Sequence, residues 1–163
     1  MTDVATPKLS DKPSEVIRQA LADMEMVEGC SNLIIDMNEW HTPFPKSSKE
    51  QLRKAQNKPN ATCAVCMAGS VISAAGNFAD QWILPHMFDE KTQNKLRALN
   101  WFRTGIFLIG LQEFPEALAR YKTDENFRHG VKSRSMNIDY HKDPVQFKKK
   151  LHEFADYLES EGL

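Results

Sequence analysis

Residues 63–75 set the strictest limit on the architecture, because almost every side chain in this segment is small or apolar. Thr62 can cap a helix at its start, and Gly76 can end that helix. A helix without a polar face has to be surrounded by the rest of the protein. The sequence therefore predicts a buried central helix over 63–75, in which small residues such as Gly69 allow other backbones to approach closely.

Amphipathic helices are predicted near both ends of the chain. Residues 11–28 carry a single apolar stripe, with Pro13 in the first turn, where a missing N–H costs nothing. Gly29 is expected to end this helix in the left-handed conformation. The last helix is expected to start at Asp143 and Pro144, a capping acid followed by proline at the first helical position.

Shorter elements are predicted between these helices, separated by turn residues. Helices are expected over 89–105, 106–113 and 115–121, and the second and third of these are expected to be short. Residues 46–59, with possible capping serines Ser47 and Ser48, predict either a marginal helix or a mobile loop. β-branched runs predict two short strands, over 33–37 and 136–140. Loops are expected over 38–45 and 128–134.

The predicted fold class follows from the balance of these elements. Two short strands cannot make a large sheet, so the chain is expected to be mainly α, a small helical domain around the buried central helix with one short two-stranded β-ribbon. Residues 1–10 are expected to form a mobile tail, and 11–163 a single helical domain.

Composition excludes several classes of protein. The 163 residues hold 21 Lys and Arg against 22 Asp and Glu, a net charge of -1, so nothing in the overall charge attracts nucleic acid or an anionic membrane. The apolar runs are too short to span a bilayer, and the first residues do not resemble a signal peptide. Three cysteines favour free thiols in a reducing compartment. These features predict a cytoplasmic protein, and no cofactor is predicted.

Cys63 and Cys66 form a C-x-x-C pattern that allows a zinc site. With His41 as a third ligand and Glu39 as a proton carrier, the set is similar to that of zinc deaminases. In those enzymes, however, the Glu follows the His, whereas Glu39 precedes His41. Two buried core thiols are the preferred interpretation, because cysteine is among the most buried residue types.

Acidic and histidine side chains flank the two predicted strands. Asp36 and His41 lie at the first strand, and Asp139 and His141 at the second. Pairing of the strands would bring these residues together as a divalent-metal site or an acid–base pair. The alternative is an exposed polar face on which the aspartates cap turns.

Two further features are candidates for partner binding. Arg128, His129, Lys132 and Arg134 make segment 128–134 basic, and such a loop could hold a phosphate, a nucleotide or an acidic partner, although charged loops are commonly just solvated. Trp40 precedes two prolines, so it is either a partly exposed interface anchor or a lid over the core.

Three short patterns resemble small uncharacterised proteins encoded by tailed bacteriophages and prophages. They are Ile35-Asp36-Met37 followed by Trp40-His41, then Cys63-x-x-Cys66-x-Ala68-Gly69, and the final helix that begins with Asp143-Pro144 and contains Phe147. The resemblance assigns no chemistry. It implies a phage accessory protein that acts in the bacterial cytoplasm, commonly by binding and blocking a host factor.

The predicted function is therefore a non-enzymatic protein that binds and inhibits or sequesters a host component, a host protein or a small anionic ligand such as a nucleotide. No catalytic residues are predicted. A metal-dependent enzyme of the zinc-deaminase or hydrolase kind is one alternative, with His41, Cys63 and Cys66 as ligands. A structural or assembly protein of the virion is the other.

Overall fold

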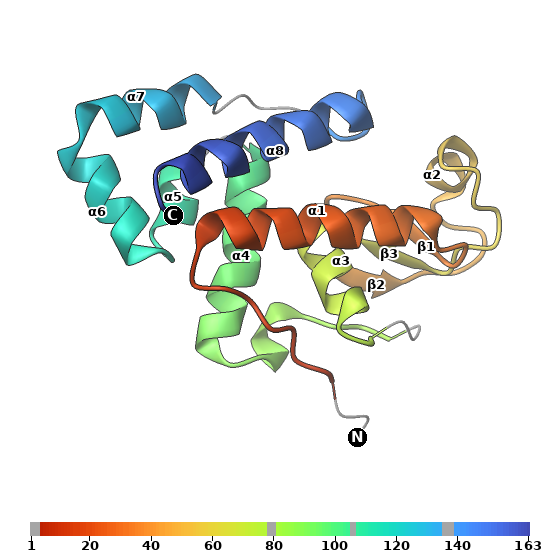
Figure 1. Cartoon of the computed structure of the whole chain (residues 1–163). Helices are drawn as coiled ribbons and strands as arrows, with labels where there is room; N and C mark the ends of the chain where they lie inside the picture. Colours follow the sequence, from red (N-terminus) through yellow and green to blue (C-terminus); the bar gives the residue numbers. More distant parts are fainter. Residues whose placement is uncertain (1–3, 78–80, 105–106, 135–138) are drawn as a thin grey trace. The chain divides into compact units, whose positions relative to one another are not determined.

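The computed structural model describes residues 4–77, 81–104, 107–134 and 139–163. Within them the chain is mainly α-helical with one small sheet, which confirms the predicted fold class (Figure 1). The chain divides into two compact units, one made of Met1–Lys8 and Ala22–Gln93 and the other of Leu9–Leu21 and Asn94–Leu163. The assignment of 11–163 to one domain stays a prediction.

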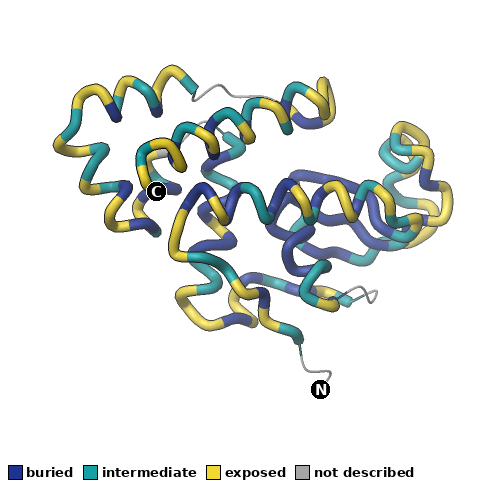
Figure 2. The backbone as a smooth tube through the Cα atoms, viewed as in Figure 1, coloured by how far each residue is buried: buried dark blue, intermediate teal, exposed yellow. Residues whose placement is uncertain are grey.

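Helix α1, Pro13–Gly29, begins and ends close to the predicted bounds and contributes residues to both units. Its apolar stripe from Val16 to Val27 is buried, and Figure 2 shows buried and exposed positions alternating along the helix. Gly29 is the last helical residue and does not have a positive φ, so the predicted left-handed stop is wrong. The next residue, Cys30, is instead joined through its N–H to the carbonyl of Val27.

The sheet of the first unit has three strands, in the order β1-β3-β2. They are β1 (Leu33–Ile35), β2 (His41–Pro43) and β3 (Cys63–Val65). The central strand β3 runs parallel to β1 and antiparallel to β2. The expected two-stranded ribbon is therefore corrected: β1 pairs with β3, and β2 lies where a loop was predicted. Residues 136–138 of the second predicted strand lie outside the described residues, and the remaining two, Asp139 and Tyr140, are in no strand.

The apolar segment 63–75 is divided between a strand and a helix. Cys66 is extended and caps the helix that follows, because its Sγ accepts a hydrogen bond from the Gly69 N–H at 3.5 Å. Helix α3 then runs over Met67–Ala74, with all residues from 67 to 73 buried. A buried helix thus exists as predicted, but it begins four residues later. A short apolar run is compatible with both a buried helix and a central strand, so the local pattern could not distinguish them.

Side chains from the segment after helix α2, Glu50–Ala55, cover the outer edge of β1. The Gln56 amide accepts a hydrogen bond from the Ile35 N–H and donates one to the Ile35 carbonyl, both at 2.8 Å. Lys58 donates to the Leu33 carbonyl at 2.7 Å. Lys49, with a φ of 57°, precedes α2 without a side-chain cap, so the predicted serine capping is wrong.

Lys58 gives a testable pH dependence. Its ammonium is buried and donates to the carbonyls of Val27 and Leu33, and burial lowers its pKa below the ordinary 10.5. Between the lowered pKa and 10.5 the unfolded chain binds more protons than the folded one, so the free energy of unfolding should rise with pH in that window. Below the window the cost of burying the ammonium is fully present.

Urea unfolding of the wild type and of Lys58→Met, from neutral pH to 10.5, measures this effect. The stability of the wild type relative to Lys58→Met should increase through the alkaline window and stay constant below it. Lys54→Met, at a side chain that is 76% exposed, is the control and should keep the pH profile of the wild type. Parallel profiles for the wild type and Lys58→Met would contradict the prediction.

The second unit contains the remaining α-helices of the described residues. These are α4 (Glu90–Thr104, which begins in the first unit), α5 (Phe107–Leu111), α6 (Pro115–Thr123), α7 (Glu125–Arg134) and α8 (Pro144–Ser160). Their core includes Phe102, whose ring centroid lies 6.0 Å from that of Phe114 and 5.8 Å from that of Phe154. Asp143 caps α8 as predicted, by accepting a hydrogen bond from the Gln146 N–H at 2.9 Å. A single-turn 3-10 helix, Pro85–Met87, belongs to the first unit.

Segment 128–134 forms the greater part of helix α7, so the predicted loop is wrong. Asp124 caps the helix by accepting a hydrogen bond from the Phe127 N–H at 3.0 Å. Phe127 and Val131, four residues apart on one face, are both buried. Burial of this face compensates for the polar and glycine-containing sequence, whose intrinsic helix preference is low.

Residues 4–12, which precede α1, have no regular secondary structure but make specific contacts. In the first unit the Asn77 amide accepts from the Ala5 N–H at 3.0 Å and donates to the Ala5 carbonyl at 2.8 Å. In the second unit the buried Lys95 donates to the Ser10 carbonyl and to Asp11, both at 2.6 Å. Among the described helices, none has the length and apolar character needed to cross a membrane.

Candidate functional site

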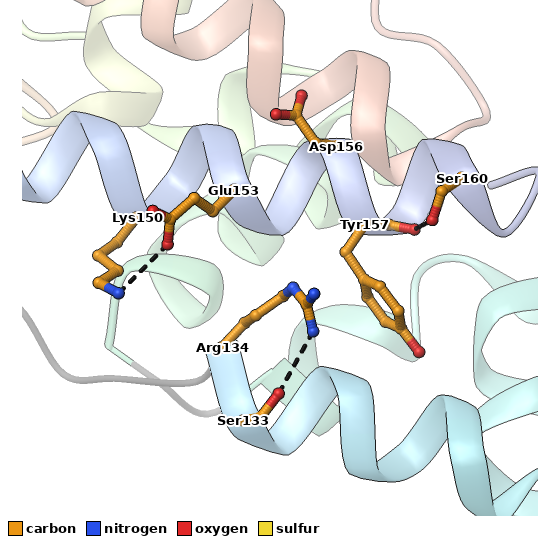
Figure 3. A pocket seen from close by; sticks show the side chains of 7 residues that line it. All are labelled: Ser133, Arg134, Lys150, Glu153, Asp156, Tyr157 and Ser160. Atoms are coloured by element: carbon orange, nitrogen blue, oxygen red, sulfur yellow. Dashed lines mark hydrogen bonds and ion pairs between the residues drawn. The ribbon is translucent and has the colours of Figure 1, made fainter.

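A groove with a volume of about 510 Å³ lies between α7 and α8, within the second unit (Figure 3). We call it the α7–α8 groove. Its volume falls in the range of small-molecule binding sites. The lining residues are Ser133 and Arg134 from α7, and Lys150, Glu153, Asp156, Tyr157 and Ser160 from α8.

Close packing of Tyr157 against the α7 backbone forms the floor of the groove. The Tyr157 ring stacks on Phe127 with centroids 5.7 Å apart, and its hydroxyl donates to the Phe127 carbonyl at 3.1 Å. Burial raises the pKa of Tyr157, which favours the protonated hydroxyl that this hydrogen bond needs. Gly130 permits the contact, because a Cβ there would overlap the hydroxyl and lie 2.8 Å from Cε2 of the ring.

Arg134, the last residue of α7, is the central cation of the groove. Its guanidinium lies over the Tyr157 ring, 4.2 Å from the centroid, in a cation–π contact. Nη1 donates to the Gly130 carbonyl at 3.0 Å and to Ser133 Oγ at 3.3 Å. In the described part of the chain, Nε and Nη2 of Arg134 have no acceptor, and no carboxylate pairs with the guanidinium.

The carboxylates of the groove are engaged with other cations. Glu153 pairs with Lys150 at 3.2 Å, and Asp156 pairs with Arg18 of α1 at 2.5 Å. Figure 3 shows the Asp156 carboxylate turned away from Arg134, and the Glu153 carboxylate directed toward Lys150. The positive charge of Arg134 therefore stays uncompensated by carboxylates of the described residues. Such a groove favours an anionic ligand.

The other predicted basic residues of α7 lie outside the groove. Arg128 donates through Nε to the Tyr121 carbonyl at 2.9 Å and through Nη2 to the Lys122 carbonyl at 2.7 Å. These are among the last carbonyls of α6, so Arg128 has a structural role at a helix end. His129 and Lys132 are exposed on α7. Their part in binding stays a prediction.

His41 is fully buried in β2, which corrects its predicted place on a contact surface. Its Nδ1 lies 2.9 Å from the Gln81 carbonyl oxygen, and its Nε2 lies 2.6 Å from the Asn77 carbonyl oxygen. A neutral imidazole carries one N–H and can donate to only one of these oxygens. Both nitrogens therefore face backbone carbonyl oxygens, and the one that carries the N–H links β2 to residue 77 or to residue 81.

The geometry does not assemble the zinc site allowed by the sequence. Cys63 Sγ is 3.6 Å from His41 Nδ1, but that nitrogen faces a carbonyl oxygen, and Cys66 Sγ accepts the Gly69 N–H. Cys63 and Cys66 are buried, and the three cysteines form no disulfide. Across residues 4–77, 81–104, 107–134 and 139–163, no group of three or more His, Cys, Asp or Glu side chains could hold a metal ion.

The acidic and histidine residues of the predicted strands are not brought together by strand pairing. Asp36 is buried next to β1 and pairs with Lys49 at 2.9 Å, as does Glu39. Although desolvation opposes the charged form, hydrogen bonds to these carboxylates raise the pKa of Lys49. Asp139 accepts the His141 N–H at 2.9 Å in an exposed turn of the other unit.

Trp40 is partly buried, and its backbone carbonyl lies directly against Gly69 of α3. The side chain therefore keeps some accessible surface, and its role as an interface anchor stays a prediction. The more exposed tryptophan is Trp82, which is 59% exposed.

Sequence reasoning placed Arg134 in a binding site, with Lys150 in the same basic stretch, but missed Tyr157 and the acidic and hydroxyl residues beside it on α8. Lys150, Glu153, Tyr157 and Ser160 follow one another at spacings of three, four and three residues, which puts them on one face of the helix. That spacing was a usable signal. The spacing indicates a binding site only when 128–134 is known to be a helix packed along the same face.

Comparisons of the chain with protein-family models, with curated proteins and with solved structures give no match.

Proposed function

We propose that the chain is a non-enzymatic binding protein that inhibits or sequesters a host component, as a phage accessory protein in the bacterial cytoplasm. The observation that carries the proposal is the α7–α8 groove, where the guanidinium of Arg134 has hydrogen-bond donors without acceptors in the described part of the chain. Groups of this kind lower the free energy of a complex when a partner supplies the acceptors.

The surroundings of His41 support binding over metal-dependent catalysis. A catalytic zinc needs ligand nitrogens and sulfurs directed at one point, together with an open coordination position. The His41 nitrogens are directed at backbone carbonyls instead, and Cys63 beside the ring is fully buried. The groove, by contrast, is open to solvent and lined by polar side chains.

Affinity capture from bacterial lysate, followed by mass spectrometry, tests the proposal. The bait is the full chain as wild type, as Arg134→Gln, and as Lys149→Gln, which removes an exposed lysine of α8 that does not line the groove. A host component should be retained by the wild type and by Lys149→Gln and depleted with Arg134→Gln. Equal retention by all three baits would contradict the groove as the binding site.

A further inference from the structure

We propose that the α7–α8 groove binds the phosphate group of a small molecule, which Arg134 holds side-on through Nε and Nη2. The inference rests on the proposed function, because it takes the groove to be a binding site, and it adds the chemical class of the ligand.

The Arg134 donors that have no acceptor among the described residues lie in a geometry suited to a phosphate. Nη1 is used by the Gly130 carbonyl and Ser133 Oγ, and these contacts, with the Tyr157 ring below, fix the orientation of the guanidinium plane. Nε and Nη2 share one edge of that plane, the edge that forms two parallel hydrogen bonds with a phosphate or carboxylate. The protein thus holds a bidentate donor pair in place before any ligand arrives.

The charges that line the groove also favour a phosphate. Lys150 lines the same groove, and its partner Glu153 lies 3.2 Å away at a side chain that is 40% exposed. Asp156 is held by Arg18 outside the groove centre. Among the residues that the structure describes, a ligand at Arg134 therefore meets one cation without a carboxylate partner and a second that is weakly paired, which favours a phosphate dianion over a carboxylate monoanion.

Contacts among the lining side chains limit what else the groove recognises. The Tyr157 ring stacks on Phe127 and also lies under the Arg134 guanidinium, and both contacts compete with the stacking of a nucleobase on this ring. Ser133 Oγ donates to the Gly130 carbonyl and Ser160 Oγ donates to the Tyr157 carbonyl. Each hydroxyl hydrogen is therefore used within its own helix and is not donated to a ligand. Recognition is therefore of the phosphate group, and a base attached to it should add little.

The test is a titration of the full chain with inorganic phosphate, followed by the 1H–15N signal of the arginine Nε groups and by calorimetry. We expect the Arg134 signal to shift, and Arg134→Lys, which keeps the charge but loses the bidentate edge, to weaken binding about tenfold or more. Lys150→Gln should weaken it several-fold. Lys149→Gln is the matched control and should bind as the wild type does.

Two further probes sharpen the assignment. AMP should bind as tightly as inorganic phosphate within a few-fold, and acetate should bind more weakly. A tenfold preference for AMP, acetate binding equal to phosphate, or an Arg134→Lys variant with wild-type affinity and an unchanged melting temperature would each overturn the inference. A chain that captures its partner but shows no phosphate-dependent shift would overturn this inference alone and leave the proposed function standing.

Discussion

Replacing Gly69 by alanine is expected to destabilise the chain by at least about 3 kcal/mol, beyond the usual cost of overpacking a core. A Cβ at this position would overlap the backbone oxygen of Trp40 and lie 2.8 Å from its carbonyl carbon. A backbone group between two elements cannot rotate away as a side chain can. Relief would therefore require α3 to move off the strand that follows Trp40, and so to lose part of the core of the first unit.

Urea unfolding followed by circular dichroism measures the effect. Gly29→Ala is the control, because Gly29 is also in a helix and nothing lies within 4 Å of its Cβ position. Alanine is preferred to glycine in helices by up to about 1 kcal/mol, so the control should be neutral or slightly stabilising. A Gly69→Ala variant as stable as the wild type would show that α3 and Trp40 are farther apart than described.

Val71→Asp is expected to leave the chain largely unfolded. Val71 lies in the middle of α3 and is 1% exposed, and a carboxylate there would be desolvated. Burying an unpaired charge costs several kcal/mol, comparable with the total stability of about 5–15 kcal/mol of a typical domain. The variant should lose its cooperative thermal transition and much of its helical circular dichroism.

The matched control is Val145→Asp, at an apolar side chain that is 74% exposed in the first turn of α8. An acid near a helix N-terminus is favourable by up to about 1 kcal/mol, so this variant should melt at or slightly above the wild-type temperature. If Val71→Asp melted as its control does, α3 would not be in the core.

The helix boundaries that could be predicted are those set by local chemistry. Asp143 with Pro144, and Pro13, marked the starts of α8 and α1, because capping and proline placement depend only on neighbouring residues. Gly76 ends α3 with a φ of 106°, as its lack of a side chain allows.

The elements that could not be predicted depend on partners far along the chain. Strand β3 forms because Cys63–Val65 pairs with Leu33–Ile35, about thirty residues earlier. Likewise α7 is helical although Gly130 and its charges indicate a loop, because Tyr157 packs where Gly130 has no side chain. In both segments packing determines the secondary structure, and local propensity carries no information about packing.

Only part of the candidate site could be predicted, because packing between helices also determines which residues form it. Arg134 was chosen from the local density of positive charge, which a sequence displays directly. In the sequence Tyr157 has no feature that distinguishes it from other helix residues. Its place beneath the Arg134 guanidinium depends on contacts between α7 and α8. His41 was misplaced because polar neighbours and prolines indicate exposure, whereas strand pairing with Val65 takes the ring into the interior.

The covered edge of β1 affects how copies of the chain behave in concentrated solution. An edge strand with vacant N–H and C=O groups can accept a strand from another molecule, which is the first step toward ordered aggregates. Gln56 occupies both groups of Ile35, and Lys58 occupies the carbonyl of Leu33. The Gln56 amide takes the place of the strand that would otherwise add there, so the Ile35 groups and the Leu33 carbonyl are not available to pair with a strand of another molecule.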